Sequence, residues 1–253
     1  MTVKDRDLMG GLAKGLKVIE AFTAEHPKLS IAEAAEVSGY DRATTRRCLL
    51  TLAELGYCAY DGKYFTVTPR ILRLGTGCLA AMPLPRIVQP YLDQLSEQIH
   101  QSTSVSILDG TEIVYVARAA QQRVMSVTLM PGSRLPAYCT SMGRVLLAAL
   151  PEEQARNLLM NEVLPARTPQ TETSPVRLLD NLQQIREQGY AAIDQEVEMG
   201  LRSIAVPLTD FRKRTVAALN VGFAVTSESL GSMVQKYLPS LQAIQAEISG
   251  TLR

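Results

Sequence analysis

The stretch KLSIAEAAEVSGYDRATTRRCLLTLAELGY, residues 28–57, decides the fold of the first part of the chain. Ser30 followed by Glu33 forms a capping box, which predicts a helix that begins directly after Ser30. Gly39 supplies a tight turn, and Asp41 is placed to N-cap a second helix whose apolar residues keep helical spacing. Two short amphipathic helices joined in this way are typical of a helix-turn-helix.

The second helix has basic and hydroxyl side chains near its N-terminal, outward side. They are Arg42, Thr44, Thr45, Arg46 and Arg47. Side chains at this place in a recognition helix enter the major groove of DNA. The alternative is a solvated face without a partner, which is the usual interpretation of a charge cluster taken alone.

Two short runs with strand character follow, and the residues between them favour a hairpin. The runs are residues 57–60 and 64–68, and Asp61-Gly62-Lys63 joins them. The order helix, turn, helix and hairpin predicts a winged helix-turn-helix that binds double-stranded promoter DNA. Lys63 at the tip of the wing would reach a phosphate or the minor groove, whereas Tyr64 is as compatible with packing as with DNA contact.

Length and composition set the broad class of the protein. With 253 residues, 46% of them hydrophobic and 20% charged, the chain suits one small and one larger globular domain. The longest apolar runs are too short for a bilayer, and the N-terminus lacks the basic start and apolar region of a secretory signal. We therefore expect a cytoplasmic protein without a membrane partner.

The charge balance bears on how DNA is bound. The net charge is +1, and residues 1–75 contain 11 Lys and Arg against 9 Asp and Glu. A strongly basic DNA-coating protein is excluded by these numbers. A symmetric homodimer would double the phosphate contacts of one weakly basic head, so we expect the protein to act as a dimer.

The cysteines and histidines predict neither a metal site nor a cofactor. The four cysteines, at positions 48, 58, 78 and 139, contain no CxxC pair, and the two histidines, at 26 and 100, lack ligand-like spacing. Structural disulfides are not expected in the compartment inferred above.

Patterns outside the recognition stretch divide the chain into three parts. A first helix over residues 11–22 is expected to brace the helix-turn-helix with Leu12, Leu16, Ile19 and Phe22, and a linker helix over 69–82 ends at Pro83-Leu84-Pro85. We place the winged domain at residues 1–68, the linker at 69–83 and an effector domain at 84–253.

The third part alternates strand and helix patterns. Strands are predicted at 104–108, 112–117, 124–129, 191–194, 203–208 and 216–223, and helices at 88–100, 141–150, from 151, 175–188 and 229–252. The expected fold class is α+β, with a largely antiparallel sheet and flanking helices.

The segment GSRLPAYCTSMGRVLLAAL, residues 132–150, is the sharpest candidate site in this part. Thr140 or Ser141 would N-cap a helix whose first free N–H groups, near Ser141 and Met142, favour an anion such as a carboxylate. Arg134 is a candidate partner because a guanidinium binds a carboxylate bidentately. The alternatives are a capped helix with nothing bound and a surface charge at Arg134.

Two polar residues interrupt apolar strands, Ser203 in LRSIAVPL and Asn220 in VAALNVGF. A buried polar group must be satisfied, so each either bonds to nearby backbone or faces a polar pocket. Asp194-Gln195-Glu196 would form one rim of such a pocket. The alternative for these three is a solvated strand end.

An enzyme and a pure dimerisation module remain as competing classes. Cys139, Thr140 and Ser141 lie on a pre-helix loop, where a nucleophile can be activated. Neither histidine accompanies them, and no GxSxG or metal motif is present, so catalysis is disfavoured.

Several segments together resemble the IclR family of bacterial transcriptional regulators along nearly the whole chain. They are LAKGLKVIEAF, DRATTRRCLLTLAELGY, YFTVTPRILRLG, GSRLPAYCTSMGRVLLA, DQEVEMGLRSIAVP and AALNV. The fourth and fifth most resemble the Pca and Pob branch, which controls protocatechuate, 4-hydroxybenzoate and β-ketoadipate catabolism.

The resemblance implies a winged helix, a linker helix and a GAF-like effector domain, assembled as a dimer or a dimer of dimers. It implies a small carboxylate effector, such as protocatechuate or β-ketoadipate, that changes DNA binding. The matching effector positions are Leu135, Ser141, Met142, Leu201, Ser203 and Asn220. Many relatives carry Val-Tyr where this chain has Thr45-Arg46, and often Cys in place of Ser203, so operator and ligand do not carry over.

Overall fold

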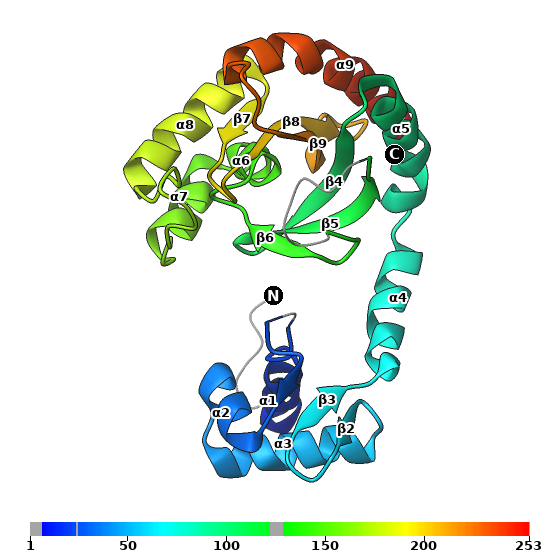
Figure 1. Cartoon of the computed structure of the whole chain (residues 1–253), viewed down its shortest axis with the longest axis vertical. Helices are drawn as coiled ribbons and strands as arrows, with labels where there is room; N and C mark the ends of the chain where they lie inside the picture. Colours follow the sequence, from blue (N-terminus) through cyan, green and yellow to red (C-terminus); the bar gives the residue numbers. More distant parts are fainter. Residues whose placement is uncertain (1–6, 24, 122–128, 253) are drawn as a thin grey trace. The chain divides into compact units, whose positions relative to one another are not determined.

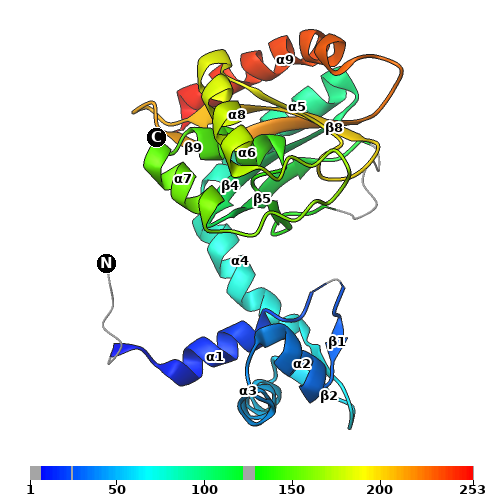
Figure 2. The same cartoon turned by 90° about the vertical axis from the view of Figure 1, so that its left-hand side faces the viewer.

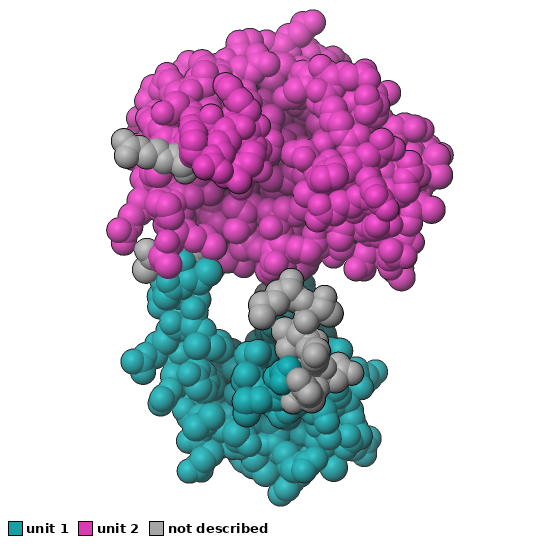
Figure 3. Space-filling view, turned by 180° about the vertical axis from the view of Figure 1, so that it is seen from behind, with its two compact units in different colours: residues 1–80 teal, residues 81–253 magenta. Residues whose placement is uncertain are grey.

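The computed structural model describes residues 7–23, 25–121 and 129–252 of the chain. The chain divides into two compact units, residues 1–80 and 81–253, which Figure 3 colours separately. Each unit has its own buried apolar core, so each is described by itself. No helix of the described residues has the length and apolarity needed to cross a membrane.

The first unit is a winged helix-turn-helix, as predicted. Its elements are α1 (Gly10–Ile19), β1 (Lys28–Leu29), α2 (Ile31–Ser38), α3 (Arg42–Glu54), β2 (Cys58–Tyr60), β3 (Phe65–Val67), the 3-10 helix η2 (Pro69–Ile71) and α4 (Leu72–Ala81), whose last residue passes into the second unit (Figure 1). The strands form a small antiparallel sheet in the order β1-β3-β2. Strand β1 was not predicted.

Local sequence signals set the ends of α2 and α3. The Ser30 side chain accepts the Glu33 N–H at 3.3 Å, and the Glu33 carboxylate accepts the Ser30 N–H at 2.7 Å. Gly39 ends α2 with a φ of 73°, a left-handed conformation that favours glycine. Asp41 then caps α3 by accepting the Thr44 N–H at 2.9 Å. The predicted caps and turn are confirmed.

The core of this unit corrects the expected face of the first helix. Val18 and Ala21 are buried in a cluster with Leu49. Leu12 and Leu16, which were expected in the core, are 60% and 47% exposed. The helical period that points Val18 inward places these two leucines on the solvent side of α1.

The second unit contains a six-stranded antiparallel sheet with helices on both faces, which confirms the α+β prediction. Its elements are α5 (Leu84–Ile99), β4 (Ser102–Asp109), β5 (Glu112–Ala119), β6 (Arg134–Pro136), α6 (Ser141–Ala148), α7 (Glu152–Met160), α8 (Pro175–Gln188), β7 (Ala191–Asp194), β8 (Leu201–Thr209), β9 (Thr215–Ala224) and α9 (Leu230–Thr251). The strand order is β6-β5-β4-β9-β8-β7.

One predicted strand of this unit is described only in part, and one predicted helix begins earlier than expected. Residues 124–128 of the strand expected at 124–129 lie outside the described residues, and Leu129 belongs to no strand. Helix α5 begins at Leu84, before the expected residue 88, because Pro85 lies in its first turn. The N–H groups of the first turn have no partner within the helix, so a proline there costs no hydrogen bond.

The helices bury the two faces of the sheet against separate cores. Helices α5 and α9 lie side by side on one face, and α6, α7 and α8 lie on the other (Figures 1 and 2). Alternation along each strand sends one set of residues to each core. On β9, Leu219 and Val221 point toward α5 and α9, whereas Ala218 and Asn220 point toward α6.

Candidate nucleic-acid interface and ligand cavity

Three arginines lie on the solvent side of α3. Arg42, Arg46 and Arg47 are exposed, and none of them has an ion-pair partner among the residues that the structure describes. Leu49, which faces the core of this unit, is fully buried. The helix is therefore held from behind while its guanidinium groups stay free to bind phosphates or base edges.

The two threonines predicted to contact DNA are buried, unlike the three arginines. Thr45 is fully buried, and its hydroxyl donates a 3.0 Å hydrogen bond to the Asp41 carbonyl oxygen. Thr44 is only 8% exposed and lies on the side of α3 that packs against α1. Thr44 and Cys48 are four positions apart, as are Thr45 and Leu49, so each threonine shares its side of α3 with a residue that packs in the core.

In the wing, two lysine ammonium groups lie near the ring of one tyrosine. Asp61 Oδ1 accepts the N–H groups of Lys63 and Tyr64 at 2.9 and 2.7 Å, which closes the turn. The ammonium groups of Lys63 and Lys28 lie 4.9 and 5.0 Å from the centroid of the Tyr64 ring. Lys28 was missed because the sequence gives no sign that β1 pairs with β3.

An apolar groove, the α1 groove, runs along the solvent side of α1. Its apolar lining consists of Leu12, Leu16, Ile19, Leu52, Leu55, Tyr57 and Leu74. Leu12, Leu55 and Leu74 are each more than half exposed. A contiguous exposed patch of this kind on a monomer marks an interaction surface.

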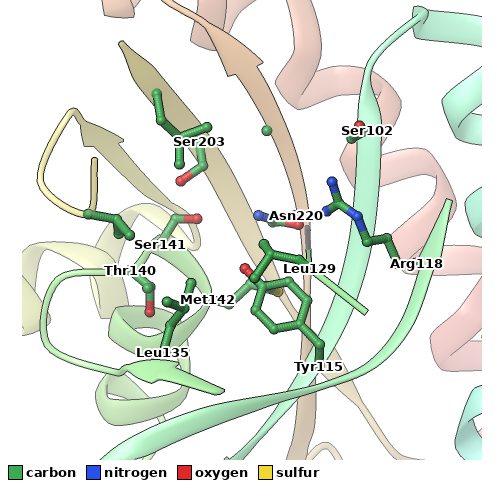
Figure 4. A pocket seen from close by; sticks show the side chains of 13 residues that line it. Ser102, Tyr115, Arg118, Leu129, Leu135, Thr140, Ser141, Met142, Ser203 and Asn220 are labelled. Atoms are coloured by element: carbon green, nitrogen blue, oxygen red, sulfur yellow. The ribbon is translucent and has the colours of Figure 1, made fainter. Parts of the chain in front are cut away.

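A cavity lies between the sheet and the start of α6 (Figure 4). Its lining residues are Ser102, Tyr115, Arg118, Leu129, Leu135, Thr140, Ser141, Met142, Val197, Leu201, Ser203, Asn220 and Gly222. The structure thus brings together the predicted positions at the α6 start and on β6, β8 and β9.

Strand pairing builds the polar floor of this cavity. Ser104 on β4 lies opposite Arg118 on β5 and opposite Asn220 on β9, so three polar residues form one row across the sheet. In the next row, Gly222 lies opposite both Ser102 and Ser203, and its missing side chain leaves space between them.

The polar atoms of the cavity are only partly satisfied. Ser141 Oγ and Asn220 Oδ1 are buried without a hydrogen-bond partner among the described residues. The Thr140 hydroxyl is occupied as the N-cap of α6, since it accepts the Gly143 N–H at 3.1 Å. Buried polar groups normally have partners, so Ser141 and Asn220 indicate a ligand or ordered water in the cavity.

The structure does not place Arg134, the predicted carboxylate partner, at the cavity, whereas Arg118 lines it. Arg134 forms ion pairs with Asp109 and Glu112 at 2.8 and 2.7 Å and does not line the cavity. Alternation on β6 sends Leu135 into the cavity and its neighbour Arg134 to the other face. Arg118 points into the cavity and has no carboxylate partner among the described residues (Figure 4).

The sequence held a usable signal for Arg118. It interrupts the apolar run of β5 just as Ser203 and Asn220 interrupt theirs. Ser102, Ser104 and Ser106 likewise alternate on one face of β4, which marks a polar strand face. Burial lowers the pKa of the Arg118 guanidinium below its ordinary value. Guanidinium groups nevertheless remain cations at neutral pH in proteins.

Asp194, predicted at the rim, is not among the residues that line the cavity. Arg202 binds its two carboxylate oxygens at 2.8 and 3.0 Å, and this contact lowers the Asp194 pKa. Glu196 is neither a rim residue nor solvated, because it is 8% exposed and pairs with Arg144. Burial raises the pKa of Glu196, and the Arg144 guanidinium opposes that shift.

The chemistry of the pre-helix loop does not suit a nucleophile. Cys139 is fully buried, and burial raises its pKa to about 11, so the reactive thiolate is scarce at neutral pH. Within the described parts of the chain, no three His, Cys, Asp or Glu side chains cluster as metal ligands do.

Comparison with known proteins finds one match for the DNA-binding part of the chain and another for the part that contains the cavity. A family model described as the IclR helix-turn-helix domain matches residues 11–62, and one described as bacterial transcriptional regulator IclR C-terminal matches residues 76–250. The Pca regulon regulatory protein of Pseudomonas putida is 44% identical over 245 residues, which are 96% of this chain and 84% of that protein.

Solved structures share the fold. The crystal structure of a protein from Rhodococcus sp. RHA1 is 41% identical, with a TM-score of 0.78 and coverage of 97% of this chain and 98% of that one. The inducer-binding domain of a PobR double mutant from Acinetobacter, solved with 3-hydroxybenzoic acid, is 31% identical, with a TM-score of 0.61 and coverage of 66% and 98%. Because the family models and the relatives span nearly the whole chain, the protein belongs to the IclR family and is a transcriptional regulator, not an enzyme.

Proposed function

We propose that this regulator controls genes of aromatic-acid catabolism and that a small carboxylate, such as protocatechuate, β-ketoadipate or a related acid, is its effector. The observation that carries the proposal is the cavity of the second unit. It combines a guanidinium without a carboxylate partner, Arg118, with two unpartnered buried polar atoms on Ser141 and Asn220. The similarity to the Pca regulon regulatory protein and to the PobR domain supports the same ligand class.

The residues have distinct roles in this proposal. Arg118 binds the effector carboxylate, because a charge-assisted hydrogen bond is the strongest contact the cavity offers. Ser141 and Asn220 bind the polar substituents of the ligand. Leu135, Met142 and Leu201 supply apolar contacts to its body, and Ser203 adds a hydroxyl to the floor.

For DNA binding, the proposal assigns Arg42, Arg46 and Arg47 to the major groove. Lys63 and Lys28 contact the backbone or the minor groove from the wing, with Tyr64 holding both ammonium groups in place. The regulator is a homodimer, or a dimer of dimers, with the α1 groove covered by a second copy. That surface is largely apolar, and Arg42 and Arg46 do not line it, so a second copy can cover it and leave these two arginines free.

A coupled binding experiment tests the proposal. The full-length protein is titrated with protocatechuate, β-ketoadipate and 4-hydroxybenzoate by calorimetry, and operator binding is measured with and without each acid by gel shift. We expect one acid to bind and to change operator affinity by about 5- to 150-fold, the usual range of allosteric coupling. If none of these acids produces heat or a thermal shift, the proposed effector class is wrong.

A further inference from the structure

One buried ion pair joins the segments that form two walls of the cavity. Arg144 on α6 and Glu196 in the β7–β8 loop are 4% and 8% exposed, and Arg144 Nη2 lies 2.5 Å from Glu196 Oε2. The two residues are 52 positions apart in sequence. Neither lines the cavity itself.

The remaining hydrogen bonds of the pair extend it to neighbouring segments. Arg144 Nε donates to the Tyr138 carbonyl at 2.8 Å, and Nη1 donates to Asn181 Oδ1 on α8 at 3.2 Å. Glu196 Oε2 also accepts the Glu172 N–H at 2.9 Å. The pair therefore ties together the loop before α6, the segment that leads into α8, α8 itself and the β7–β8 loop.

Both partners stand next to residues that do line the cavity. Arg144 follows Ser141 and Met142 on α6, and Val197 follows Glu196 directly. The Glu196 carbonyl oxygen is also fixed, since it accepts the Thr171 hydroxyl at 2.7 Å. A shift of Arg144 relative to Glu196 would change the position of Ser141 relative to Val197.

Energetics indicate that the pair fixes geometry more than it stabilises the fold. Desolvation of two buried charges consumes most of their attraction, so replacing both partners by apolar residues is often neutral for stability. Removing one partner is strongly destabilising, because it leaves a buried charge alone. Substitutions can therefore separate the effect of the pair on the geometry of the cavity from its effect on the stability of the fold.

We propose that Arg144 and Glu196 are positioning residues for the effector: they hold Ser141 at the distance from Val197 that the bound acid requires. This inference rests on the proposed function of the cavity. It predicts that effector affinity depends on the pair even where stability does not.

The test compares the double variant Arg144→Met/Glu196→Leu with the wild type and with Arg214→Gln as the control. Arg214 pairs with the buried Asp210 at the turn between β8 and β9, at 2.6 Å, and does not line the cavity. We expect the double variant to retain a melting temperature near that of the wild type, with an effector Kd raised about tenfold or more. The control loses melting temperature without a change in Kd.

Hydrogen exchange of the free protein gives a readout that does not need the effector. We expect faster exchange in residues 139–146 and 195–201 of the double variant, and unchanged exchange there in the Arg214→Gln protein. If the wild type binds none of the acids, the proposed function fails while the exchange result still decides the role of the pair. A double variant with wild-type Kd, or with wild-type exchange in both segments, overturns the inference.

Discussion

Arg118 and Ser104 face each other across β5 and β4, where Arg118 Nη1 donates a 2.9 Å hydrogen bond to Ser104 Oγ. A neutral hydroxyl positions the guanidinium without neutralising it. Arg134, on the neighbouring strand, is neutralised by Asp109 and Glu112. The two arginines therefore differ in their capacity to bind an anionic ligand.

This difference gives a matched pair of substitutions. Arg118→Gln should weaken effector binding about tenfold to a hundredfold, because a hydrogen bond to a charged group contributes about 1.5–3 kcal/mol. Arg134→Gln should leave the affinity within about twofold of wild type. Calorimetric titration with the effector measures both. Equal losses in the two variants would mean that Arg118 does not bind the carboxylate.

The arginines of α3 should control operator affinity. Arg46→Ala and Arg47→Ala are expected to weaken operator binding by about fivefold to a hundredfold, the range for loss of one base contact. A phosphate contact would show instead as a uniform loss across sequences and a smaller salt slope. Gel shifts at several salt concentrations distinguish the two roles. Arg156→Ala, at an exposed ion pair on α7, is the control, and a similar loss there would contradict the assignment.

The α1 groove should determine self-association of the winged units. Leu12→Asp/Leu16→Asp introduces two charges into the interface and should raise the dimer Kd at least about tenfold, since each buried leucine contributes about 1.5–3 kcal/mol. Sedimentation over a range of concentrations measures this change. Val163→Asp, at a residue that is 87% exposed in the second unit, should behave as wild type. Unchanged association of the double variant would place the dimer interface elsewhere.

Gly143 is required for the packing of α6. A Cβ added at this position would overlap the Ala137 carbonyl and would lie 2.5 Å from Thr140 Oγ1. Gly143→Ala should therefore lower the free energy of unfolding by at least about 1–3 kcal/mol. Gly231→Ala on α9, where the nearest neighbouring atom is 3.9 Å away, should be neutral or slightly stabilising. Thermal denaturation of both variants checks the contrast, which would fail if they melted alike.

The cysteines should divide into reactive and protected groups. Cys78 is exposed, whereas Cys58 and Cys139 are buried and burial raises the pKa of each to about 11. At pH 8 only about one in a thousand of the buried thiols is ionised. A thiol reagent should therefore label Cys78 quickly and the other two only after denaturation, as read by mass spectrometry. Rapid native labelling of Cys139 would contradict its burial and reopen a catalytic role.

Local chemistry explains what could be predicted about the DNA-binding unit. The Ser30 capping box, the Asp41 cap and the Asp61 turn each join residues at most three positions apart, so short sequence windows contain all of their partners. Thr45 was misplaced because its burial depends on which side of α3 packs in the core. That choice depends on distant residues such as Val18 and Phe65.

The sequence by itself determined the winged fold, the antiparallel sheet with its helices, and the helix start at Ser141, because periodicity, caps and turn residues act over a few positions. Only the tertiary structure decided that Arg118 rather than Arg134 enters the cavity, and that Arg144 meets Glu196. Strand pairing and loop packing bring such residues together from distant parts of the chain, and no local pattern records which charges neutralise each other.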